Sequence, residues 1–123
     1  MRMEKKARNF RDYKVWHDAI MLSTAMYKQT NEMPWFEKKG LCDQMQRAVV
    51  SIASNIAEGT ARPSDTEFTH FLDIALGSAY EVETQLLIAH NIGYLDNEKY
   101  MELNSMVVTI ECQLNRLIKT LRT

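Results

Sequence analysis

Apolar residues recur every three or four positions in four segments of this 123-residue chain. This spacing is typical of one face of an α-helix. We therefore predict four helices, at about 12–31, 36–62, 64–93 and 97–121. Pro34 and Pro63 separate the first three helices, because the residue before a proline avoids the helical conformation.

Residues at the predicted helix ends also fit helix termini. Ser64 and Glu67 have the Ser-x-x-Glu spacing of a capping box at the start of the third helix. Asp96 is an expected cap for the fourth helix. Gly59 is interpreted as the C-terminal cap of the second helix, and the third helix is expected to end near Gly93.

The first two helices differ in how much apolar surface they carry. The first is predicted to bury one face, made of Trp16, Ala19, Ile20, Ser23, Met26 and Tyr27. In the second, Val50, Ala53 and Ala57 extend the apolar character beyond a single stripe. A helix that is apolar more than halfway round needs two neighbours or a partner chain.

Short connections between helices of this length favour antiparallel neighbours. The predicted fold is therefore all-α, a single up-down-up-down four-helix bundle over residues 1–123. Residues 1–10 are predicted to form a flexible basic segment. We expect no membrane span, because no run approaches the roughly 20 apolar residues that crossing a bilayer requires.

Few residues carry the signature of an active site. The pair Glu67 and His70 forms a single Glu-x-x-His, whereas carboxylate-bridged di-iron bundles use two such pairs. Cys42 has no histidine near it in the sequence, and Cys42 and Cys112 are expected to be reduced, partly buried thiols of a cytoplasmic protein. We predict no catalytic residue, metal or cofactor. A metal- or thiol-dependent enzyme stays as the third hypothesis.

The charge of the chain is unevenly distributed, although the net charge is only −1. Residues 1–14 and 103–123 are basic, and residues 64–102 are strongly acidic. In an antiparallel bundle the two chain ends meet, so a basic pole follows that suits phosphate groups or an acidic partner. The candidate nucleic-acid contacts are Lys5, Lys6, Arg8, Arg11, Lys14, Arg116, Lys119 and Arg122.

Aromatic residues mix with lysines in the first connection, where Trp35 and Phe36 precede Lys38 and Lys39. Such mixing can stack bases and hold phosphates. It can equally seal an interface between subunits. The sequence leaves both interpretations open.

Polar residues interrupt the apolar end of the second helix. Asn55 is expected to hydrogen-bond across helices and fix their register, and Glu58 to pair with Arg47 or Arg62. The alternative interpretation is a ligand or partner site made of Asn55, Glu58, Gly59 and Arg62.

The same region carries a resemblance. The run Asn55-Ile56-Ala57-Glu58-Gly59, followed by Gly77-Ser78, resembles the four-helix-bundle family encoded in intervening sequences of bacterial 23S ribosomal RNA genes. Further matches extend from Phe10 to Leu121. The resemblance implies a four-helix bundle that assembles into a homopentamer.

A related branch of that family is the accessory protein of diversity-generating retroelements. Its members bind a reverse transcriptase and nucleic acid through a strongly basic surface. This chain differs in its net charge of −1 and its acidic third helix. Our leading hypothesis is a non-enzymatic homo-oligomeric scaffold or binding protein, and the alternative is an RNA- or DNA-associated accessory protein that binds through its basic chain ends.

Overall fold

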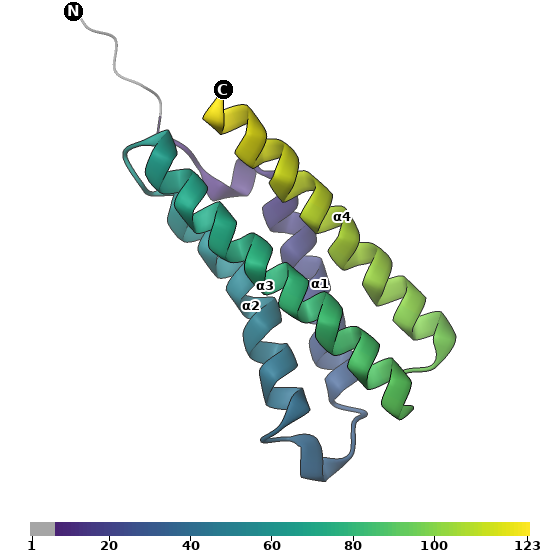
Figure 1. Cartoon of the computed structure of the whole chain (residues 1–123). Coiled ribbons are helices and arrows are strands. Elements are labelled where there is room, and N and C mark those ends of the chain that lie inside the picture. Colours follow the sequence, from purple (N-terminus) through teal and green to yellow (C-terminus); the bar gives the residue numbers. More distant parts are fainter. Residues whose placement is uncertain (1–6) are drawn as a thin grey trace, which may run out of the picture.

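The computed structural model describes residues 7–123, and its regular structure is entirely helical over that range. Four long helices form an antiparallel bundle, as predicted (Figure 1). Two short 3-10 helices, η1 and η2, precede the first and second long helices. The elements are η1 (Phe10–Asp12), α1 (Lys14–Thr30), η2 (Trp35–Glu37), α2 (Leu41–Thr60), α3 (Asp65–Ile92) and α4 (Asn97–Arg122).

The four long helices stand at the corners of a square. Helices α1 and α3 each pack on α2 and on α4, and they do not pack on each other. In Figure 1, η1 and the C-terminus of α4 lie at one end of the bundle, and η2 and the α3–α4 turn lie at the other. Helices α1 and α3 are therefore diagonal neighbours, with outer faces on opposite sides of the molecule.

The buried face of α1 differs in part from the predicted one. Val15, Ala19, Leu22 and Met26 are buried there, whereas Ile20 and Tyr27 are about two-fifths exposed. The prediction was right for Ala19 and Met26 and wrong for Ile20 and Tyr27, because apolar residues surround much of this helix and the pattern did not show that Leu22 marks the inner side. Trp16 is half-buried at the edge of the core.

The apolar residues of α2 are largely used inside its own bundle. Val49, Ile52 and Ile56 are fully buried, and Ala53 is 7% exposed. Helix α2 is flanked by both α1 and α3. Its wide apolar surface therefore needs no partner chain. Among residues 7–123, Val50 is the one large hydrophobic residue of α2 that is exposed.

Helix α2 begins at Leu41, later than predicted, because residues 35–37 form the separate helix η2. The carboxylate of Glu37 accepts a hydrogen bond from the backbone N–H of Leu41 at 3.4 Å and one from the Tyr94 hydroxyl at 2.7 Å. The bond to Glu37 raises the pKa of Tyr94. Glu37 thus joins the α1–α2 connection to the α3–α4 turn.

The predicted ends of α3 and α4 are confirmed. Ser64 Oγ accepts from the Glu67 N–H at 3.1 Å, and the Ser64 hydroxyl donates to the Glu67 carboxylate. Asp96 accepts from the Lys99 N–H at 2.7 Å. Gly93 has φ +99°, which favours glycine, and it ends α3.

Candidate functional site

The close approach of α2 to α3 depends on Gly59. A β-carbon on Gly59 would lie 2.9 Å from Phe68 Cδ1 and 2.9 Å from Phe71 Cβ. Atoms this close repel each other, so a glycine lets the two helices touch. The interpretation of Gly59 as a helix cap is wrong, because α2 continues to Thr60.

Two arginines stack on the same aromatic pair. The Arg62 guanidinium lies 4.8 Å from the centre of the Phe71 ring, and the Arg8 guanidinium lies 4.8 Å from the centre of the Phe68 ring. The Glu58 carboxylate accepts a hydrogen bond from Arg62 at 3.1 Å, as predicted. The aromatic rings and these cations attract each other through the ring quadrupole.

Arg8, near the start of the described residues, bonds to the α2–α3 connection and to the first residue of α3. Its guanidinium donates to the Arg62 carbonyl at 3.0 Å and forms an ion pair with Asp65. Only 14% of the Arg8 side chain is exposed. Arg8 therefore makes specific contacts within the segment that the sequence assigned to a flexible tail.

Asn55 does not itself cross between helices. It donates to the Ser51 carbonyl at 2.8 Å and to Ser51 Oγ at 2.9 Å, one turn earlier in α2. Ser51 Oγ then bonds Ser78 Oγ of α3 at 2.8 Å. The expected cross-helix link exists, but Ser51 and Ser78 make it, and Asn55 orients Ser51.

The predicted ligand or partner site therefore has a structural role at one end of the bundle. Its residues are Asn55, Glu58, Gly59 and Arg62. Arg62 contacts Glu58 and the Phe71 ring, Asn55 orients Ser51, and Gly59 lets α2 and α3 approach. This arrangement resembles a packed joint more than an open ligand site.

The basic residues at the chain ends are partly neutralised. Lys14 pairs with Asp18 at 2.7 Å, and Arg122 pairs with Asp73 at 2.6 Å. Arg11 lies over the Phe10 ring. Arg116 and Lys119 are exposed on α4 and form no ion pair with the described residues. Lys5 and Lys6 lie outside the described residues.

The residues considered for metal or thiol chemistry are separated. Within residues 7–123, no three His, Cys, Asp or Glu side chains gather as metal ligands. Glu67 is held in the capping box. Cys42 is buried beside the Thr30 carbonyl, and Cys112 is exposed rather than partly buried as expected.

An apolar face on α3 remains uncovered. Its large hydrophobic side chains are between 40% and 54% exposed. Sequence reasoning missed this face because it assigned the surplus apolar surface to the second helix. The residues of this face, which we call the α3 ridge, are Ile74, Tyr80, Leu87, Ile88 and Ile92.

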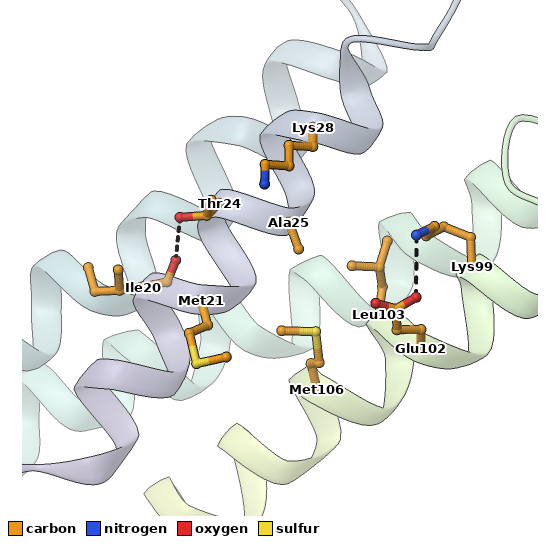
Figure 2. A pocket seen from close by; sticks show the side chains of 9 residues that line it. All are labelled: Ile20, Met21, Thr24, Ala25, Lys28, Lys99, Glu102, Leu103 and Met106. Carbon is orange, nitrogen blue, oxygen red and sulfur yellow. Dashed lines mark hydrogen bonds and ion pairs between the residues drawn. The ribbon is translucent and has the colours of Figure 1, made fainter.

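A groove runs between α1 and α4, on a different side of the bundle from the α3 ridge. It has a volume of about 460 Å³ and is shown in Figure 2. Met21 and Met106 face each other across it, one turn along the helices from Ala25 and Leu103, and Lys28 stands at its rim. We call this the α1/α4 groove; no pattern in the sequence indicated it, since it depends on how the helices pack.

A smaller hollow continues the α1/α4 groove along the same two helices. It is lined by Lys14 and Asp18 of α1 and by Ser105 and Thr109 of α4, and Met21 and Met106 border both hollows. The groove therefore extends along α1 from the level of Lys28 to that of Lys14.

None of the helices within residues 7–123 is both long and apolar enough to cross a bilayer. This finding agrees with the absence of a long apolar run in the sequence.

Comparisons with known proteins identify a solved structure of similar fold and a matching family. A crystal structure of a protein of the S23 ribosomal protein family from Bacteroides thetaiotaomicron VPI-5482, whose function is unknown, superposes with a TM-score of 0.79. It is 26% identical, and the match covers 85% of this chain and 98% of that one. No curated protein matches the chain. The model of the 23S rRNA-intervening sequence protein family matches residues 11–116, and the chain therefore belongs to this family.

Proposed function

We propose that the protein is a non-enzymatic scaffold or binding protein that works as a homo-oligomer, in the form of a homopentamer. The observation that carries this proposal is the α3 ridge, a set of large apolar side chains that the bundle leaves exposed. Fully burying one such side chain contributes about 1.5–3 kcal/mol. Covering several of them favours association.

The contacts of the polar residues support binding rather than catalysis. Ser51 and Ser78 join α2 to α3, and the polar residues Asn55, Glu58 and Arg62 are engaged in hydrogen bonds to residues one turn away. The free thiols of Cys42 and Cys112 support a cytoplasmic location. The pentamer is the assembly that the family resemblance implies.

Light scattering coupled to size-exclusion chromatography tests the proposal. We expect a particle of five copies of the 14.3 kDa chain at tens of micromolar. Ile88→Glu places a charge on the α3 ridge and should yield monomers. Met101→Glu places the same charge on an exposed site of α4 and should assemble normally. A wild-type protein that is strictly monomeric would overturn the proposal.

A second candidate function is RNA or DNA association. Arg116 and Lys119 favour it, because both are exposed and unpaired within the described chain. Binding driven by phosphates weakens steeply with salt. Labelled RNA and DNA titrated at low and high salt test it. Absent binding at low salt, or binding unaffected by Arg116→Ala and Lys119→Ala, would exclude this candidate for these residues.

A further inference from the structure

The α3 ridge and the α1/α4 groove lie on different sides of the bundle. Helix α3 packs on α2 and α4 and never on α1, so its outer face points away from α1. Two different surfaces on different sides can join identical copies head to tail. Such heterologous contacts generate rings when the rotation closes.

The two surfaces are of similar length. Ile74, Glu81 and Ile88 occur at intervals of seven residues, as do Tyr80 and Leu87. Residues seven apart lie two turns apart on nearly the same side of a helix. The ridge from Ile74 to Ile92 spans eighteen residues, about 27 Å at 1.5 Å per residue. The groove extends along fourteen residues of α1, about 21 Å, so it can take up most of the ridge.

The α1/α4 groove has the surface that receives a helix. Its floor is apolar, and the two methionines that wall it have flexible, polarizable side chains that adapt to the shape of a partner. An amphipathic helix commonly lays its apolar face into such a groove. Met21 is 61% exposed, so its side chain is available for this contact.

The charges of the two surfaces are complementary. Helix α3 contains five acidic residues and no lysine or arginine. Glu81, on α3 between Ile74 and Ile88, forms no ion pair with the described residues. In the groove, Lys14 pairs with Asp18 and Lys99 pairs with Glu102 at 3.3 Å, whereas Lys28 at the rim forms no ion pair with the described residues (Figure 2). Acidic and basic groups so arranged guide two surfaces into one register.

We propose that the α1/α4 groove of one subunit receives the α3 ridge of the next copy. This inference rests on the proposed self-association and specifies its contact: Ile88 inserts between Met21 and Met106, and Glu81 approaches Lys28 at the rim. Each subunit then uses two different surfaces, one toward each neighbour.

Mixing two variants tests this contact. Met21→Glu damages only the groove, and Ile88→Glu damages only the ridge. Each variant alone should be monomeric by light scattering. An equimolar mixture should form a dimer of one copy of each, because one intact ridge and one intact groove remain. Met101→Glu is the matched control. Met101 is 62% exposed and Met21 is 61% exposed, but Met101 lies outside the groove.

The outcomes separate this contact from self-association itself. If Met21→Glu assembles like the wild type while Ile88→Glu does not, the ridge binds elsewhere and the inference is wrong, although the scaffold proposal stands. If both variants are folded by circular dichroism and their mixture stays monomeric, the inference is also wrong. A monomeric wild-type protein would instead remove the proposed function.

Discussion

Gly59 and Phe68 touch so closely that a β-carbon on Gly59 would stand 2.9 Å from Phe68 Cδ1. Phe68 is fully buried, so its ring cannot simply swing into solvent. We expect Gly59→Ala to lower the free energy of unfolding by about 1–3 kcal/mol through overpacking. Urea unfolding followed by circular dichroism measures this change.

Gly77 supplies the matched control for that substitution. It also lies inside a helix, but a β-carbon there would meet no atom within 4 Å. Gly77→Ala should therefore raise the free energy of unfolding by about 0.5–1 kcal/mol, because alanine favours the helix. Equal effects of the two substitutions would show that the approach at Gly59 does not matter.

The hydrogen bond between Ser51 and Ser78 should appear as a coupling between two mutations. Each serine replaced by alanine leaves its partner without the bond, and Ser78 is only 8% exposed. We expect each single change to cost about 1–2 kcal/mol. The double mutant should cost less than the sum, by about 0.5–1.5 kcal/mol. Strict additivity would contradict a direct bond.

The end of α3 depends on the left-handed conformation of Gly93. The Gly93 N–H donates to the His90 carbonyl at 3.0 Å, and the Tyr94 N–H donates to the Ala89 carbonyl at 2.9 Å. Gly93→Ala should destabilise the fold by about 1–2 kcal/mol, the cost of a side chain at positive φ. Gly93→Asn should cost less, because asparagine tolerates this conformation. Thermal unfolding of the two variants compares them.

A buried carboxyl group should make stability depend on pH. Burial, and then the neighbouring carboxyl of Glu83, raise the pKa of Glu111 to about 7. Between pH about 4.5 and 7 the folded protein holds a proton that the unfolded chain has released. The free energy of unfolding should therefore fall across this window, by about 1–3 kcal/mol.

Glu111→Gln isolates this effect. The variant cannot ionise at this position, so its stability relative to the wild type should rise from pH 4.5 to 7 and stay constant above. Glu98→Gln, at an exposed site of the same helix, should show no such trend. Denaturant unfolding at pH 4.5, 6 and 8 decides between these results.

The sequence was sufficient for those features that depend on local residue order. Pro34, Pro63, the pair Ser64 and Glu67, and Gly93 placed the connections and therefore the bundle. The early start assigned to α2 was wrong, because residues 35–37 form the separate helix η2. Glu37 of η2 bonds to Tyr94, a residue 57 positions away that no local pattern could relate to it.

Features created by packing could not be obtained in the same way. In the sequence alone, Gly59 is consistent with a helix cap. Only the position of Phe68 shows that Gly59 permits the contact between α2 and α3. Ile20 and Leu22 are equally apolar, so the inner side of α1 depends on where its neighbours stand. The α1/α4 groove likewise exists only between two helices that are distant in the chain.

The two cysteines differ in exposure, which allows a spectroscopic label to be attached to one of them selectively. Cys112 is exposed on α4, while Cys42 is buried against the first connection. A maleimide fluorophore should therefore attach at one position per folded molecule without any engineered residue. Resonance energy transfer between donor- and acceptor-labelled copies would then report the exchange of subunits in real time.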